Sequence, residues 1–221
     1  MGFTLTNPNF AHPGEILHRI LTSLGICKSL DDVKEAFLNA ENQAREINLL
    51  SSFGKMKREE YWLKWNVLVL RRLGIENAEL AKNVQSKWDQ FVDNTLYPEV
   101  MGGLSELKTK GLKIGLISNI YEEKIHACLQ EAGLGGAVFD VVVGVDAIGE
   151  MKPHPGVFKY ALHKLNVEPE ETIFVGDDVE VDYKGAESVG IHALLINRTK
   201  EKVLSDPKTI TDLREILPRI Y

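Results

Sequence analysis

The chain has 221 residues, of which 44% are hydrophobic and 26% charged, and its formal net charge is -6 at pH 7. This length fits one large domain or a core with an inserted cap, and the composition excludes long disordered stretches. The negative charge argues against a protein that binds the nucleic-acid backbone, although local phosphate binding stays possible. No stretch approaches ~18 apolar residues and no signal peptide is seen, so we expect no membrane partner and a cytoplasmic location.

The two cysteines give no sign of a metal or disulfide site. Cys27 and Cys128 lie far apart, and neither is in a CxxC pair or near a histidine at metal spacing. We expect both to be buried thiols in a reducing compartment. The sequence leaves the oligomeric state open, a homodimer included.

Residues from about Pro13 to Phe91 have the apolar spacing of helices, three and four residues apart. Ser29 to Asp32 has the residue types of a helix start, and Gly54 those of a break. The tryptophans of this region are expected in its core, and its basic residues on a solvated face. The tryptophans are Trp62, Trp65 and Trp88, and the basic residues are Arg45, Lys55, Lys57, Arg58, Lys64, Arg71 and Arg72.

After Pro98 the pattern changes to alternating strands and helices. A helix is predicted from Val100 to Thr109, closed by Gly111, and another begins near Pro155. Continuous apolar runs between helices predict a doubly wound parallel sheet, covered on both faces. These runs are residues 113–117, 139–144, 172–175 and 192–196, and a last helix is expected within residues 209–221.

Polar residues follow three of these strands. Ser118 and Asn119 come after the first strand, Asp177 and Asp178 after the third, and Lys152 lies on the loop after the second. In open parallel sheets the ligand binds beyond the carboxyl ends of the strands. A hydroxyl, a cation and a carboxylate pair at that edge suit a phosphate group and a hard metal ion.

Each of these residues also has an ordinary structural interpretation. Ser118 could be a turn residue, Asp177 could cap the following helix, and Lys152 could be solvated. Their joint occurrence, in order and at strand ends, favours a site instead. A carboxylate that attacks phosphorus would complete the chemistry, and no residue fills that role in this set.

Three segments carry a resemblance to a known family: Leu116 to Asn119, Gly149 to Phe158, and Phe174 to Ala186. From about Leu96 to Asn197 the sequence resembles the haloacid dehalogenase-like hydrolase superfamily. The resemblance implies a Rossmann-like core of residues 1–14 and 95–221, with a helical cap of residues 15–94. It also implies Mg2+ as cofactor and a set of site roles. Thr4, Ser118 and Lys152 would act in catalysis, with Thr4 helping to orient the phosphate and Ser118, Asn119 and Lys152 binding it. Asp177 would be the metal ligand, supported by Asp178 and Asp182.

The first motif of that family, Asp-x-Asp-x-Thr, is where the chain departs. Thr4 and Leu5 match its Thr-Leu, which puts Gly2 at the second Asp and the nucleophilic Asp before Met1. Gly2 could give its backbone carbonyl to the metal, but it has no acid to protonate a leaving group. Asp93-Asn-Thr-Leu imitates the second half of the motif, but Phe91 stands at the nucleophile position, so we interpret Asp93 as the exit from the cap.

In this family the first strand is central in the sheet. Without it, two buried strands are left unpaired or the sheet closes up, and several unpaired groups at ~1–3 kcal/mol each would consume much of a stability of ~5–15 kcal/mol. We therefore expect the natural protein to begin upstream, with a strand that ends in Asp. The in-frame genomic sequence 5′ of the start codon tests this expectation.

Three functions remain open at this level. The first is a Mg2+-dependent phosphatase of small phosphorylated metabolites that acts through an aspartyl-phosphate. The second is a 2-haloacid dehalogenase-type hydrolase. Its members lack the second Asp of the first motif, and in this chain Gly2 stands at that position. The third is a binding protein that keeps the fold without activity. In each case the expected ligand is a small phosphorylated or otherwise anionic molecule.

Overall fold

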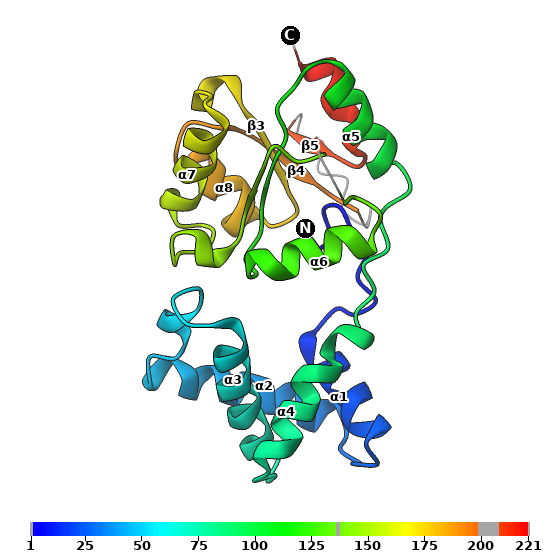
Figure 1. The fold of residues 1–221 in the computed structure, drawn as a ribbon, viewed down its shortest axis with the longest axis vertical. Coiled ribbons are helices and arrows are strands. Elements are labelled where there is room, and N and C mark those ends of the chain that lie inside the picture. Colours follow the sequence, from blue (N-terminus) through cyan, green and yellow to red (C-terminus); the bar gives the residue numbers. More distant parts are fainter. Residues whose placement is uncertain (1, 136–137, 199–207, 221) are drawn as a thin grey trace. The chain divides into compact units, whose positions relative to one another are not determined.

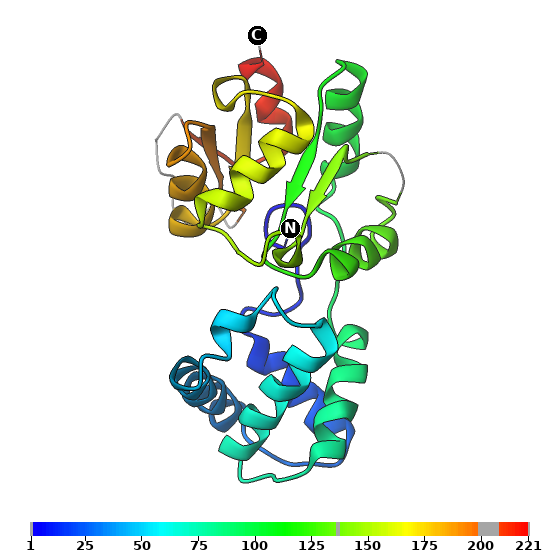
Figure 2. The ribbon, with the colours of Figure 1, turned by 60° about the vertical axis from the view of Figure 1, so that its left-hand side comes forward.

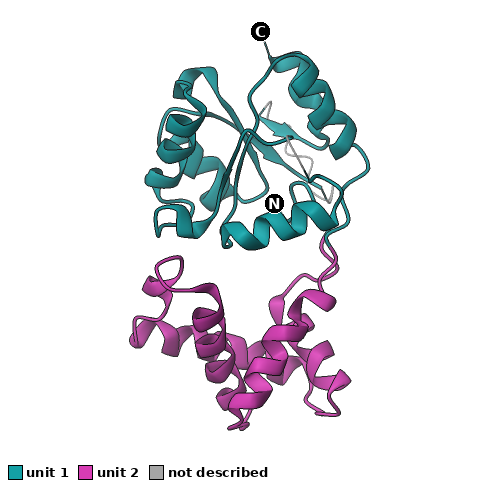
Figure 3. Ribbon diagram, in the orientation of Figure 1, with its two compact units in different colours: residues 1–7, 94–221 teal, residues 8–93 magenta. Residues whose placement is uncertain are grey.

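The computed structural model describes residues 2–135, 138–198 and 208–220. The chain forms two compact units, residues 8–93 and residues 1–7 with 94–221 (Figure 3). Compared with the predicted boundaries, residues 8–14 lie in the helical unit, because they lead into a helix that starts at Pro13. Within the described residues, no helix is long and apolar enough to cross a membrane.

The helical unit is built around one hydrophobic core. Ile16, Ile20, Val33 and Ala81 are fully buried in it. The three tryptophans pack partly buried against this core, as predicted. The helices are α1 (Pro13–Ser23), α2 (Leu30–Glu46), α3 (Arg58–Arg72) and α4 (Ala78–Lys87).

Two local predictions for this unit can be compared with the structure. The hydroxyl of Ser29 accepts a hydrogen bond from the backbone N–H of Asp32 at 3.1 Å, so the predicted start of α2 is confirmed. The prediction of two buried thiols was wrong for Cys27, which is exposed in the loop between α1 and α2, whereas Cys128 is buried. A short connecting loop has too few neighbours to cover its side chains.

The second unit is the α/β core, in which strands and helices alternate (Figure 1). All four predicted strands are present at their apolar runs, although β3 extends one residue beyond its run, to Gly176. The helix before them has the predicted bounds. Gly111, with φ of 77°, ends that helix in the left-handed conformation that glycine adopts readily. The elements are α5 (Val100–Thr109), β1 (Gly115–Ile117), α6 (Glu122–Glu131), β2 (Val141–Val143), α7 (Pro155–Leu165), β3 (Ile173–Gly176), α8 (Lys184–Glu187), β4 (His192–Ile196) and β5 (Thr209–Ile210).

The last predicted element was wrong in type. Instead of one helix from Thr209, the chain forms β5 and then a 3-10 helix, Leu213–Arg219. Ile210 pairs with Ile196 of β4 and is almost fully buried, so sheet burial outweighs the helical spacing that follows. Pro218 lies inside the 3-10 helix and has no N–H to donate to an α-helical bond.

The sheet of this unit is divided into two parallel ladders. Among the described residues, β1 pairs only with β2, and β3 pairs only with β4, which pairs in turn with β5. Within residues 2–135, 138–198 and 208–220 the sheet has not closed up, and one edge of β1 and one edge of β3 have no ladder partner. Strands in the middle of a parallel sheet are usually buried on both faces. Ile173, Phe174 and Val175 of β3 are only half-buried, as expected for a strand with one edge unpaired among the described residues.

Both ladders nevertheless share the same two layers of helices (Figures 1 and 2). On one face, Ile117 of β1 and Phe174 of β3 pack into the cluster around Phe158 of α7. On the other, Leu116 of β1 and Leu194 of β4 belong to the same core as α5. The two ladders are thus parts of one covered sheet, and their carboxyl ends lie in one region, which we call the polar edge.

Candidate active site

At the end of β3, the backbone of Gly176 lies so close to Asp182 that only glycine fits there. A Cβ atom on Gly176 would lie 2.3 Å from the Cβ of Asp182, so a side chain there would displace Asp182. The π-helical turn Val179–Tyr183 brings Asp182 back to the strand end. Single π-turns of this kind are frequent at functional sites.

Asp178 is the residue that caps this turn. Its Oδ1 accepts hydrogen bonds from the backbone N–H groups of Glu180 and Val181, both at 2.8 Å. The capping role that could explain Asp177 in structural terms therefore belongs to its neighbour. Asp177 lies at the polar edge, and the cap of this turn is Asp178.

Asp182 connects the loop after β3 to Lys152. Its Oδ2 accepts from the backbone N–H of Asp177 at 3.1 Å and from that of Asp178 at 3.3 Å, while its Oδ1 lies 2.5 Å from Lys152 Nζ. The side chains of Lys152 and Asp182 are 8% and 7% exposed. Charges buried this deeply are stable only when they are paired and hydrogen-bonded, and both conditions are met here.

Asn119 holds the backbone of Lys152 from the β1 side. Its Nδ2 donates to the Lys152 carbonyl at 2.9 Å, and its Oδ1 accepts from the Lys152 N–H at 2.8 Å. The preceding residue, Ser118, is buried, and its N–H donates to the Val143 carbonyl at 3.0 Å. Its Oγ makes no hydrogen bond to any residue in the described ranges, so this hydroxyl is available to a ligand.

Thr4 reaches the same edge from the N-terminal segment. Its Oγ1 donates to Asp177 Oδ1 at 2.5 Å, and its side chain is buried. Residues 3–5 form a turn closed by a bridge between Gly2 and Thr6, so Thr4 does not stand at the end of a strand. Gly2 is exposed, and a Cβ placed on it would meet nothing within 4 Å, so no steric reason requires glycine there.

The structure therefore joins Thr4, Asp177, Asp182, Lys152 and Asn119 in one continuous hydrogen-bonded network, with Ser118 next to it in sequence. Burial raises the pKa of Asp177 above its usual range, and the hydrogen bond from Thr4 opposes this rise. The nearby Asp182 raises it further, whereas Lys152 lowers it. An ionised Asp177 in this position would gain from a cation beside it.

The donors at the polar edge fit Mg2+ in one particular mode. Within the part of the chain that the structure describes, no group of three His, Cys, Asp or Glu side chains is arranged to hold a metal ion. Asp178 and Asp182 are committed to backbone N–H groups and to Lys152, which leaves the Asp177 carboxylate. Mg2+ often binds through one or two carboxylates, with waters and substrate phosphate oxygens completing its shell, and a single carboxylate fits that mode.

Comparison with known proteins gives the class. The sequence profile of the haloacid dehalogenase-like hydrolases matches residues 4–190. The chain belongs to this family of hydrolases, as its motifs suggested.

Two curated relatives and one solved structure show how far the similarity extends. The chain is 28% identical to haloacid dehalogenase-like hydrolase domain-containing protein 3 of Xenopus laevis over 210 residues, which are 89% of this chain and 83% of the relative. It is 35% identical to the glyceraldehyde 3-phosphate phosphatase of Methanocaldococcus jannaschii over 177 residues, 77% of each chain. The HAD-hydrolase YfnB of Bacillus subtilis, solved bound to magnesium, shares the fold with a TM-score of 0.73 at 18% identity, covering 100% and 95% of the two chains.

Proposed function

We propose that this chain belongs to a Mg2+-dependent phosphatase that acts on small phosphorylated metabolites. The observation that carries the proposal is the network from Thr4 through Asp177 and Asp182 to Lys152 at the polar edge. The Lys152 ammonium and the Asp177 carboxylate belong to this network, and Ser118 follows β1 next to Asn119, so a cation, a hydroxyl and a carboxylate support the proposal. The similarity to a glyceraldehyde 3-phosphate phosphatase supports a phosphorylated substrate.

Each residue has a role in the proposal. The Ser118 hydroxyl and the Asn119 N–H bind phosphate oxygens, and the Lys152 ammonium offsets their charge. Asp177, with the backbone carbonyl of Gly2, would hold Mg2+, which when bound would neutralise charge on the phosphoryl group. Asp182 keeps Lys152 and the loop after β3 in place, and Asp178 fixes the start of the turn.

The reaction also needs a nucleophile. A carboxylate oxygen forms a bond to phosphorus while the bond to the ester oxygen breaks, and water then hydrolyses the acyl phosphate. Residues 1–14 contain neither Asp nor Glu. The proposal therefore needs a carboxylate on a further strand, and the edges of β1 and β3 that have no ladder partner among the described residues would accommodate such a strand.

The experiment compares this chain with one extended by the in-frame residues encoded upstream. Phosphate release is measured from glyceraldehyde 3-phosphate, phosphoserine and p-nitrophenyl phosphate, with and without Mg2+. We expect Mg2+-dependent release from the extended chain and little from the shorter one. The matched control is the extended chain with its strand-terminal Asp replaced by Asn, which should be inactive while still binding Mg2+.

Two other outcomes would favour the alternatives. Release of halide from a 2-haloacid without Mg2+ would favour a dehalogenase-type hydrolase, which the missing second acid at Gly2 allows. Phosphate or Mg2+ binding without turnover of any compound in both chains would favour a binding protein that retains the fold. The carboxylate of Asp177 directly after Gly176 is the feature that favours the phosphatase over both.

A further inference from the structure

A second buried ion pair lies beside the polar edge, outside the network described above. Arg198 follows β4 by two residues, and Glu99 directly precedes α5. Their side chains form an ion pair, and each is 8% exposed. Removing a guanidinium and a carboxylate from water is unfavourable unless further contacts compensate it, so the other partners of this pair are informative.

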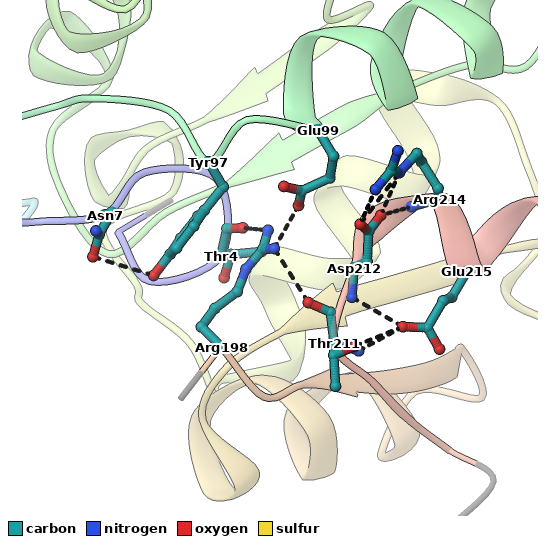
Figure 4. Close-up of polar contacts among 9 residues, drawn as sticks. All are labelled: Thr4, Asn7, Tyr97, Glu99, Arg198, Thr211, Asp212, Arg214 and Glu215. Carbon is teal, nitrogen blue, oxygen red and sulfur yellow. Dashed lines mark hydrogen bonds and ion pairs between the residues drawn. The ribbon is translucent and has the colours of Figure 1, made fainter. Parts of the chain in front are cut away.

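From the end of β4, Arg198 contacts three other segments of the α/β unit, as Figure 4 shows. Besides Glu99, its guanidinium donates to the carbonyl oxygen of Thr4 at 2.5 Å and to that of Thr211 at 3.4 Å. It also lies over the ring of Tyr97, 4.0 Å from the centroid. One side chain thus connects the N-terminal turn, the approach to α5, the end of β4 and the residue after β5.

Thr4 is the link between Arg198 and the site. The Thr4 carbonyl accepts a hydrogen bond from Arg198, and the Thr4 hydroxyl donates one to Asp177. The backbone and the side chain of Thr4 are therefore held by different partners. The turn around it is closed by the Phe3 N–H bond to the Thr6 carbonyl and joined to Tyr97 through the Leu5 carbonyl. It contains Phe3 with φ of 58°, a conformation that is unfavourable for a residue with a side chain. These contacts hold the residues on either side of Thr4, whereas within the described residues the hydrogen bond to the Thr4 carbonyl comes from Arg198.

We propose that Arg198 is a positioning residue, which holds the Thr4 backbone so that the Thr4 hydroxyl stays on the Asp177 carboxylate. The final step, orientation of Asp177 toward Mg2+, rests on the proposed function. Arginine suits this task because its planar fork donates in several directions while its face stacks on Tyr97. Lysine at position 198 would keep the charge but not this set of simultaneous contacts.

The test compares R198M and R198K with R214M. Arg214 belongs to an ion pair with Asp212 in the same region, but its side chain is 63% exposed and makes no hydrogen bond to Thr4 or Tyr97 within the described residues, so it is a matched control. The first readout is hydrogen exchange at the amides of Phe3 and Tyr97, which donate to Thr6 and Leu5. We expect at least tenfold faster exchange in R198M, a smaller increase in R198K and no change in R214M.

The second readout is the affinity for Mg2+ alone, measured by titration calorimetry. Replacing a residue that supports a metal ligand typically weakens binding by about 10–100-fold, and we expect R198M to lie near the lower end. Because Arg198 is proposed to act through Thr4, R198M should weaken Mg2+ binding much less in a T4V background than in the wild type. Equal weakening in both backgrounds would overturn the proposal, as would unchanged exchange at Phe3 and Tyr97 in R198M.

The two readouts also separate this inference from the proposed function. If the wild type does not bind Mg2+, the proposed function is wrong, and amide exchange alone still decides whether Arg198 holds the turn. If R198M does not fold, R198K supplies the same comparison, since it retains the charge opposite Glu99. Exchange in R198K equal to that of the wild type would then count against the proposal.

Discussion

The two units of this protein are stabilised in different ways. In the helical unit, buried apolar side chains from all four helices form one core. In the α/β unit the hydrophobic residues fall into two clusters on the two faces of a divided sheet, and polar contacts connect its segments at one edge. In the α/β unit, then, the residues proposed for function also connect segments of the fold, whereas the helices of the other unit are joined by one apolar core.

Breaking the buried pair at the polar edge should give the largest effect on stability. K152M leaves the Asp182 carboxylate buried without its cation, a change that typically costs about 3–5 kcal/mol. The measurement is urea unfolding followed by probes in each unit, and only the α/β unit should be destabilised. The double variant K152M/D182N should recover part of the loss, because it removes the uncompensated charge. A K152M protein as stable as the wild type would contradict the proposed importance of this pair.

A core truncation in the helical unit tests the other side of the comparison. Ile20 is fully buried in α1, so I20A should destabilise that unit by roughly 2–5 kcal/mol and leave the polar edge unaffected. L38A is the control on the same unit, because Leu38 is 60% exposed and its removal should change stability by no more than about 0.5 kcal/mol. Equal destabilisation of both units by I20A would show that the comparison between them is wrong.

A smaller effect is expected from one methyl group at the end of β3. G176A places a Cβ within 2.3 Å of Asp182 and forces that side chain away from Lys152, at a typical cost of about 1–3 kcal/mol. Gly102 in α5 is the matched control, since a Cβ there meets nothing within 4 Å, and alanine is favoured over glycine in a helix. G176A should lower the midpoint of thermal unfolding, and G102A should leave it unchanged or raise it.

The sequence predicted four of the strands that the structure describes, because each lies in a continuous apolar run next to a clear helix signal. Residues at strand ends were predictable for the same reason, since parallel strands bring their carboxyl ends to one edge. Thus the strand pattern alone was enough to group Ser118, Lys152 and Asp177 at one edge of the sheet. The last strand, β5, was missed because two residues that pair with β4 are too short for a pattern.

The connections between these positions could not be predicted in the same way. That Asp182 pairs with Lys152 depends on a π-helical turn, and no sequence period signals such a turn. Arg198 and Glu99 were missed because a buried ion pair between residues 99 apart has the same composition as two exposed charges. Polar contacts of this kind depend on the tertiary fold, whereas apolar periodicity is local. The sequence could therefore predict the residues at the strand ends of the candidate site, but not the contacts that join them.

The smallest predicted effect concerns the charge of Asp177, and its sign distinguishes a functional carboxylate from a structural one. Burial raises the pKa of Asp177 in the folded protein, so the fold favours the protonated form. As the pH rises from the unfolded pKa through the folded one, stability is lost, and at neutral pH the ionised group is a net cost. D177N should therefore raise the midpoint of thermal unfolding at about pH 7, by less than any change above, and have almost no effect at about pH 3.

Asp140 provides the control with the opposite sign. Hydrogen bonds from Lys108 and from the Ile114 N–H lower the pKa of Asp140, so its ionised form stabilises the fold above the unfolded pKa, and this contribution is lost as the pH falls through the folded one. D140N should lower the thermal midpoint at about pH 7, and this effect should shrink as the pH falls below the unfolded pKa of Asp140. If D177N also destabilises the protein at neutral pH, the ionised Asp177 is a structural group, as Asp140 is. A stabilising D177N that abolishes Mg2+ binding would instead mean that this carboxylate is retained at the polar edge at the expense of stability, as expected for a metal ligand.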